Sequence, residues 1–97
     1  MIPVKRLEIV IEAPRSKIVT DLLASHGLKG WTRIRGASGK GDRGERRDDE
    51  LTGVASNVVI VTTCPPEQSE SLFDALRDVL ARHGGICLVS DAQWLSH

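Results

Sequence analysis

Glycines and cations gather between residues 33 and 44, and these residue types together can bind an anion. Arg33, Arg35 and Lys40 carry the positive charge, and residues 36–53, GASGKGDRGERRDDELTG, hold five of the nine glycines. Glycine lets a backbone approach an anion closely and present successive N–H groups to it. Each cation can add charge-assisted hydrogen bonds of about 1.5–3 kcal/mol. The segment predicts an anion site, and the alternative is a solvated loop whose mixed charges keep the chain soluble.

More specific phosphate and nucleic-acid motifs do not fit this segment. Residues 39–44, GKGDRG, match G-x-G-x-x-G, but the dinucleotide mechanism needs an amphipathic helix next, and ERRDDELTG follows instead. A P-loop needs Ser or Thr after its lysine, whereas Gly41 follows Lys40. The G-x-x-G at residues 36–39 does not join two helices as in KH domains, and the three aromatic residues are misplaced for stacking RNA bases. No nucleic-acid partner is expected.

Catalysis and metal binding are not indicated either. The sequence pairs no nucleophile with an oriented base. His26 and His83 fall at the ends of predicted helices, where an imidazole can cap carbonyls and favour the helix dipole. The acidic run at residues 48–50 is interpreted as a solvated loop surface. We therefore expect neither an enzyme nor a metal site.

Composition bounds the remaining classes of protein. Ninety-seven residues make one domain, and 13 basic against 13 acidic residues argue against bulk binding to nucleic acid or to an anionic membrane. No signal peptide or membrane span is predicted, so the expected location is the cytoplasm. Cys64 and Cys87 stand in apolar runs and are interpreted as buried reduced thiols, although the sequence leaves a disulfide between them open.

Hydrophobic periodicity predicts four strands and two helices around the glycine-rich loop. Alternation or short apolar runs indicate strands at residues 4–12, 31–35, 56–64 and 86–89, with a partial strand around Trp94 and Leu95. Apolar residues at helical spacing indicate helices at residues 16–26 and 67–83. Gly27 and the pair Gly84-Gly85 are placed to end these helices.

The order strand, helix, strand, loop, strand, helix, strand predicts an α+β, ferredoxin-like βαββαβ domain. Its four-stranded antiparallel sheet has two helices on one face. The third and fourth strands are apolar on both sides, so the second face needs a partner. Burial of apolar surface contributes about 25 cal/mol per Å², so leaving this second face exposed to water would cost several kcal/mol of stability. A homo-oligomer is expected on these grounds alone.

Several segments in this order resemble the PII-like signalling protein superfamily. They are KRLEIVIE at residues 5–12, HGLKGWT at 26–32 and RIRGASGKGDRG at 33–44. GWTRIRGASGKG and HGGICLVSDAQWL are especially similar to the carboxysome-associated and bicarbonate-transporter-associated members. The resemblance covers nearly all of residues 1–97 as a single PII-like domain. It implies a homotrimer whose long loop between the second and third strands, about residues 36–55, is the T-loop.

The resemblance also implies an adenine nucleotide in the clefts between subunits. Thr32, Val61, Thr62 and Thr63 would contact adenine and ribose. The phosphates would meet the base of the T-loop at Gly36, Ser38, Gly39, Lys40 and Gly41, with Arg33 and Arg35 as weaker candidates. The turn formed by Gly84, Gly85 and Ile86 would supply the third wall.

Departures from the family pattern narrow the ligand. RHGGICL, at residues 82–88, has no room for the longer loop that clamps a triphosphate, and the only glutamines are Gln68 and Gln93. These features favour AMP or ADP over ATP and argue against 2-oxoglutarate sensing. The tyrosine that some members have uridylylated is absent.

Bicarbonate is implied by the subgroup as a second ligand near the nucleotide phosphate. A protein partner, such as a bicarbonate transporter or a carboxysome component, would bind the T-loop. Alternatives are a ferredoxin-like oligomeric enzyme, and an interaction module or small-anion or metal-responsive regulator without nucleotide binding. The sequence leaves open the physiological nucleotide, the partner and the direction of regulation.

Overall fold

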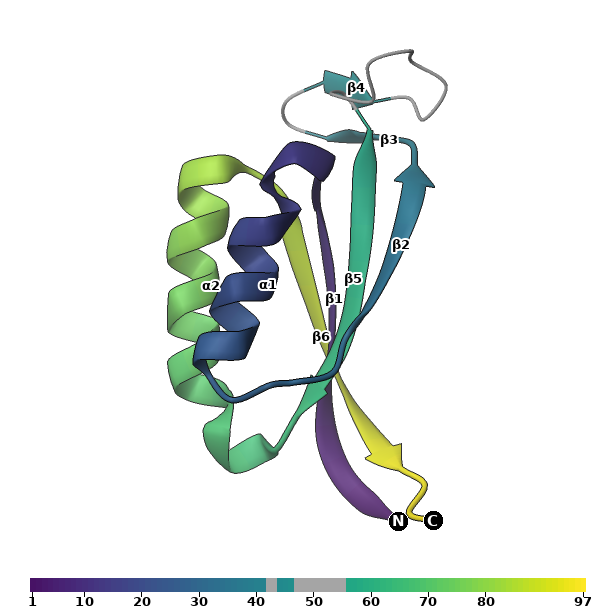
Figure 1. Cartoon of the computed structure of the whole chain (residues 1–97), viewed down its shortest axis with the longest axis vertical. Helices are drawn as coiled ribbons and strands as arrows, with labels where there is room; N and C mark the ends of the chain where they lie inside the picture. Colours follow the sequence, from purple (N-terminus) through teal and green to yellow (C-terminus); the bar gives the residue numbers. More distant parts are fainter. Residues whose placement is uncertain (42–43, 47–55) are drawn as a thin grey trace.

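The computed structural model describes residues 1–41, 44–46 and 56–97. A four-stranded antiparallel sheet in the order β2-β5-β1-β6 forms its centre. Figure 1 shows both helices against one face of this sheet. The predicted ferredoxin-like βαββαβ arrangement is therefore confirmed.

The strands are β1 (Ile2–Glu12), β2 (Thr32–Ala37), β3 (Gly39–Gly41), β4 (Gly44–Arg46), β5 (Asn57–Cys64) and β6 (Ile86–Trp94). The helices are η1 (Ala13–Arg15), α1 (Ser16–Ser25), η2 (Pro66–Gln68) and α2 (Ser69–His83). Three strands differ from the prediction: β6 is one long strand, and β3 and β4 pair inside the segment expected to lack regular structure. The remainder of the predicted T-loop, residues 42–43 and 47–55, lies outside the described residues, as does the acidic run at 48–50.

The core lies between the helices and the sheet. Period-2 alternation in β1 turns Leu7, Ile9 and Ile11 inward, where each is at most 1% exposed. The matching positions of β5 are also buried, since Ile9 lies opposite Ile60 in the register. Among the described residues, the buried hydrophobic side chains are Leu7, Ile9, Ile11, Val19, Leu23, Leu28, Val58, Ile60, Cys64, Leu72 and Leu76.

Gly27 ends α1 as predicted. Its φ of +81° is a conformation that favours glycine. The Gly27 N–H donates to the Ala24 carbonyl and the Leu28 N–H donates to the Leu23 carbonyl, each at 3.0 Å. This pair of hydrogen bonds is the Schellman arrangement, and the buried side chains of Leu23 and Leu28 accompany it. Ile18, which fitted the same helical pattern, is 37% exposed on the outer side of α1.

The other face of the sheet carries apolar side chains that the described part of the chain does not cover. They alternate with the core residues along each strand, and we call them the open face: Ile2, Val4, Val10, Ile34, Val59, Val61, Ile86, Leu88 and Trp94. Ile86 and Leu88 are 55% and 58% exposed. An ion pair of 2.7 Å between Arg6 and Glu8 lies in β1 on the same face. The two-sided apolar pattern predicted for the later strands is therefore present, and in a single chain this surface meets solvent.

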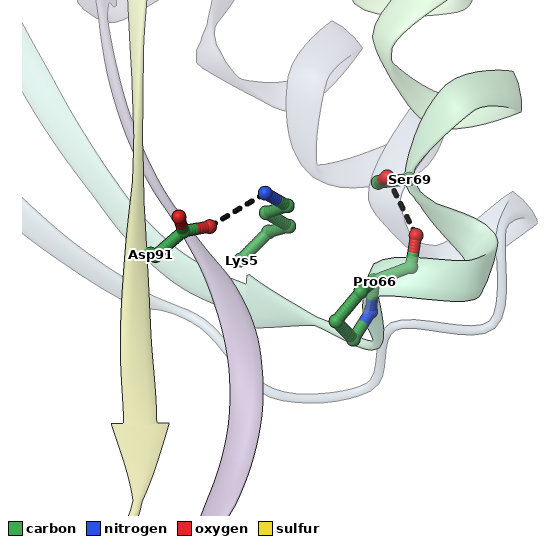
Figure 2. A network of polar contacts seen from close by, with 4 residues as sticks. All are labelled: Lys5, Pro66, Ser69 and Asp91. Carbon is green, nitrogen blue, oxygen red and sulfur yellow. Dashed lines mark hydrogen bonds and ion pairs between the residues drawn. The ribbon is translucent and has the colours of Figure 1, made fainter.

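The ends of β1 and β6 run on together past β5. Ile2 lies opposite Trp94, whereas the last residue of β5, Cys64, lies opposite Lys5. Figure 1 places both chain termini at this end, away from β3 and β4. Figure 2 shows the Lys5 ammonium bonded to the Asp91 carboxylate across the β1–β6 pair.

The same close-up shows how α2 begins. The Ser69 hydroxyl donates to the Pro66 carbonyl at 2.7 Å, across the step from η2 into α2. Ser69 is 4% exposed, so this hydrogen bond gives a partner to a hydroxyl that is buried away from water. Within the described ranges no helix has the length and apolar character to cross a membrane, and no three acidic, histidine or cysteine side chains cluster as metal ligands.

Candidate functional site

The predicted adenine and ribose contacts lie on two neighbouring strands, but on different faces of the sheet. Thr32 of β2 lies opposite Val61 of β5, and both side chains, with Thr63, belong to the open side. Thr62 points the other way, because successive side chains of a strand alternate. Its hydroxyl donates to the Gly30 carbonyl at 2.7 Å, and the residue is only 4% exposed. The structure thus gives the Thr62 side chain a role in holding β5 to the segment before β2.

Replacing Thr62 tests this assignment. We expect Thr62→Val to lower the free energy of unfolding by about 1 kcal/mol, because the hydrogen bond from the buried Thr62 hydroxyl to the Gly30 carbonyl is lost. Nucleotide affinity should not change. Thr63→Val is the matched control, since Thr63 is the next residue and faces the open side. Denaturant unfolding and titration calorimetry would measure the two effects. If Thr62→Val weakened nucleotide binding without lowering stability, the Thr62 hydroxyl would be a nucleotide contact and not a structural one.

A β-bulge at Gly36 sets the direction in which the T-loop base leaves the sheet. Ile34 lies opposite Val59 and Ala37 opposite Asn57, so β2 has one more residue than β5 in this interval. Gly36 has a φ of +74°, which fits the glycine conformation of such bulges. Sequence reasoning missed the bulge, although an isolated glycine within a strand pattern is its usual signal.

Beyond the bulge the predicted phosphate contacts follow at once. Ser38 is exposed, and Gly39, Lys40 and Gly41 form β3, which pairs with β4. Figure 1 shows this small two-stranded sheet at the end of β2. Five of the predicted contacts thus lie within six consecutive residues at one end of the main sheet, starting from Gly36. Two glycines flank Lys40, and their lack of side chains allows close approach of an anion to the backbone.

The two candidate arginines of β2 differ in their surroundings. Arg33 lies on the helix side, where its Nη1 donates to the Ser16 hydroxyl at 3.1 Å. Ser16 begins α1 and its hydroxyl donates in turn to the Ala13 carbonyl at 2.9 Å. Arg35 is exposed, and it has no ion pair with another residue in the described ranges. Both arginines are exposed, and Arg35 is the less constrained, because of the two only Arg33 has a side-chain hydrogen bond to another described residue.

The third predicted wall lies on the far edge of the sheet. Gly84 and Gly85 have φ values of +78° and +104° and join α2 to β6. A Cβ added at Gly85 would lie 2.6 Å from the Val10 carbonyl oxygen, so glycine is required for this close approach. The next residue, Ile86, lies opposite Val10 and is exposed on the open face.

One chain therefore carries two halves of the predicted site at opposite edges of its sheet. The T-loop base follows β2, whereas the Gly84–Ile86 turn leads into β6, and β5 and β1 lie between them. Three interstrand spacings of about 4.8 Å separate the two edge strands by about 14 Å. Both halves lie toward the same end of the sheet, because Ile86 pairs with Val10 and Ala37 pairs with Asn57 beside Glu12.

The two cysteines stand apart on the helix side. Cys64 lies opposite Lys5 and Cys87 lies opposite Ile9, on different sides of β1. Two strand spacings and four residues of rise separate them by well over the roughly 7 Å limit for a disulfide. Burial raises the pKa of both thiols, which keeps them protonated and weakly nucleophilic at neutral pH. Both are free thiols in the structure, as the sequence favoured.

Comparisons with known proteins agree with the fold described above. The family model described as nitrogen regulatory protein P-II matches residues 4–97. The structure of CPII, a PII-like protein from Thiomonas intermedia K12, bound to ADP, AMP and bicarbonate, has a TM-score of 0.87. It is 30% identical in sequence, and the match covers 95% of this chain and 88% of that one.

Two further comparisons bracket this similarity. CPII bound to ADP and bicarbonate matches with 32% identity and a TM-score of 0.83, over 95% of this chain and 88% of that one. A putative PII-like signalling protein from Thermus thermophilus has a TM-score of 0.80 over 97% of this chain and 91% of that one, at 22% identity, which shows the fold alone. No curated protein matches the chain.

Proposed function

Because this chain belongs to the family of nitrogen regulatory protein P-II, we propose that it is a regulator that binds AMP or ADP, together with bicarbonate. Proteins of this family are signalling proteins rather than enzymes, and the chain is a PII-like regulatory protein in the same sense. The nucleotide, the bicarbonate and their position are the proposal. The observation that carries it is the fold shared with nucleotide-bound CPII over 95% of this chain at 30% identity.

The separation of the two half-sites supports a cleft between subunits. An edge strand of one copy can meet the opposite edge strand of the next copy in a closed ring. The T-loop base after β2 of one subunit would then approach the Gly84–Ile86 turn of its neighbour. The open face supplies the apolar surface that such an assembly needs. A homotrimer satisfies both observations and is the assembly that the family implies.

The proposed signal is carried by the T-loop base. Phosphate oxygens would accept hydrogen bonds from the backbone between Gly36 and Gly41, with Lys40 and Arg35 supplying charge. The ligand can shift the loop only by the difference between its affinities for the alternative loop arrangements. A protein partner that binds one arrangement then reads the nucleotide state. Bicarbonate would occupy the same basic region, next to the phosphate.

Titration calorimetry of the purified protein with AMP, ADP and ATP, each with and without bicarbonate, tests the proposal. Saturable binding of AMP or ADP, tighter than that of ATP, is expected, with an affinity that changes when bicarbonate is added. An unchanged nucleotide affinity would remove bicarbonate from the proposal. Absence of binding by all three nucleotides would favour a regulator that responds to another small anion.

Lys40 provides a more specific test of the phosphate position. We expect Lys40→Ala to weaken ADP binding by about tenfold or more, corresponding to loss of one charge-assisted hydrogen bond. Adenosine, which lacks phosphate, should bind the variant and the wild type equally. Lys29→Ala is a matched control, because Lys29 is an exposed lysine ahead of β2. Equal losses for ADP and adenosine would remove Lys40 from the phosphate site.

A further inference from the structure

The open face carries an ion pair in the middle of its apolar surface. Nη2 of Arg6 donates to Oε1 of Glu8 at 2.7 Å, and the two side chains are 40% and 34% exposed. Both belong to β1, which is an inner strand of the sheet, so the pair lies away from both sheet edges. From Ile2 to Val10, the three fully described strands β1, β5 and β6 hold no other charged residue on this face.

The residues that lie opposite one another across these strands form rows, and the rows differ in polarity. Arg6 lies opposite Thr63 of β5 and Ser90 of β6, so its row is polar. The row of Val10 is wholly apolar. Neighbouring rows on one face are two residues, or about 6.8 Å, apart. That distance exceeds the reach of a hydrogen bond, so a partner shifted by one row no longer contacts the same charges.

Neither charged group is fully used by the contact within the chain. A guanidinium donates from several N–H groups, and a carboxylate accepts on both of its oxygens. Among the described residues the pair makes no second polar contact, so Arg6 keeps free donors and Glu8 keeps a free Oε2. Water can meet these groups in the single chain. A wholly apolar partner on the open face would exclude that water and leave both groups unsatisfied, which is costly.

A second copy of this chain can supply the missing partners. It brings a donor and an acceptor at the same spacing, and the pair has no net charge, so the copies do not repel one another. In a closed ring, Arg6 of each copy can donate to Oε2 of Glu8 in the next copy while it keeps its own bond. The same contact would bury apolar neighbours such as Leu88, which is 58% exposed in the single chain.

We propose that Arg6 and Glu8 form an ion-pair network between copies, which selects the register and the number of copies that associate through the open face. This inference rests on the proposed function, because the assembly proposed there covers this face. The apolar side chains supply the attraction, whereas a copy shifted by one row would bury the charges against apolar side chains. Polar groups in an apolar interface can fix register in this way. A fixed register would bring the T-loop base of one copy to the Gly84–Ile86 turn of the next.

A charge swap tests whether the contact crosses between copies. Arg6→Glu/Glu8→Arg keeps an ion pair within each chain and should associate with itself. In a mixed assembly, cations of the two kinds of chain would meet, and so would anions, so the two chains should assemble separately. Native mass spectrometry after joint refolding of the swapped chain with nitrogen-15-labelled wild type would measure the mixing. Statistical mixing of the two chains would overturn the contact between copies.

Sedimentation velocity of neutral variants tests the selecting role. Arg6→Met should weaken association by about a hundredfold or more, because Glu8 is left buried without its cation. Arg6→Met/Glu8→Leu removes both charges, and it should associate at least as tightly as the wild type but into several species. Lys17→Met is the matched control, since it removes an exposed ion pair of 2.8 Å with Asp21 on α1 and should leave association unchanged. Wild-type association of Arg6→Met, or a double variant that forms a single species of wild-type size, would contradict the proposal.

The wild type itself separates this inference from the proposed function, when sedimentation and ADP calorimetry are run on one preparation. A wild type that assembles but binds no ADP would remove the nucleotide from the proposed function, and the mixing experiment would still decide the ion-pair network. A wild type that binds ADP as a monomer would overturn the network and leave nucleotide binding in place.

Discussion

Leu88→Asp is expected to convert the proposed trimer into monomers and to abolish the proposed nucleotide binding with it. Leu88 lies on the open face of β6 and is 58% exposed in the single chain. In an assembly, each copy would lose about 1.5–3 kcal/mol of leucine burial. Each copy would also bury an unpaired carboxylate, which costs several kcal/mol more. Both losses are repeated in all three subunits.

Sedimentation velocity and calorimetry with ADP would measure these effects on one preparation. Ile18→Asp is the control, since Ile18 is 37% exposed on the outer side of α1 and takes the same chemical change. It should remain trimeric and bind ADP as the wild type does. A Leu88→Asp trimer would show that the open face is not the assembly surface. A Leu88→Asp monomer with full ADP affinity would place the nucleotide site within one chain.

Gly85→Ala is expected to lower the free energy of unfolding by about 2–5 kcal/mol, more than the other glycine-to-alanine substitutions considered below. The φ of +104° is strained for alanine. The new Cβ would also lie 2.6 Å from the Val10 carbonyl oxygen, a backbone atom in the middle of the sheet, and 3.2 Å from a methyl group of Leu80. Relief requires β1 or the turn to move, so nucleotide affinity should fall as well.

Two other glycines serve as graded controls for Gly85→Ala. Gly30→Ala meets nothing within 4 Å and needs no positive φ, so its stability should match that of the wild type. Gly27→Ala meets nothing within 4 Å but has a φ of +81°, and it should lose about 1–2 kcal/mol from backbone strain alone. Denaturant midpoints at equal slopes would give the order. A Gly85→Ala variant as stable as Gly30→Ala would contradict the close approach to β1.

Local patterns in the sequence were sufficient for much of the fold. The alternation of apolar and polar residues around Leu7, Ile9 and Ile11 identified the central strand because one of its faces is buried in the core. Gly27 and Gly84 marked both helix ends because a left-handed backbone conformation there is nearly a glycine property. The order of the elements then restricted the arrangement to one sheet with two helices on one face.

Features that depend on pairing with distant strands were not predictable in the same way. The second half of β6 contains Ser90, Asp91 and Gln93, and it becomes a strand because β1 lies beside it, with Lys5 opposite Asp91. The β3–β4 pairing has no hydrophobic signal, since GKG and GER are its strands.

The candidate site shows the same limit. Val61, Thr62 and Thr63 are predicted contacts that follow one another in β5, but only the structure shows that the Thr62 side chain points into the core. Arg33 and Arg35 were equivalent in the sequence, but only the structure shows that Arg33 bonds to Ser16 at the start of α1. The separation of the two half-sites likewise follows from strand order, which no local pattern contains.

The strand order also governs how this chain folds as it leaves the ribosome. β1 is synthesised first, yet both of its neighbours, β5 and β6, come from the second half of the chain. Ile2, for example, cannot form its pairing until Trp94 has been synthesised. No pairing of the main sheet can form until β5 has emerged, and among the described residues before β5 the local structure is η1, α1 and the β3–β4 pair. Chains dominated by such long-range pairings fold slowly, because the cost of closing long loops precedes the stabilising contacts. Until β5 has emerged, the apolar strand β1 must remain unpaired, and its second neighbour β6 comes only near the end of synthesis, which makes chaperone binding most useful during that interval.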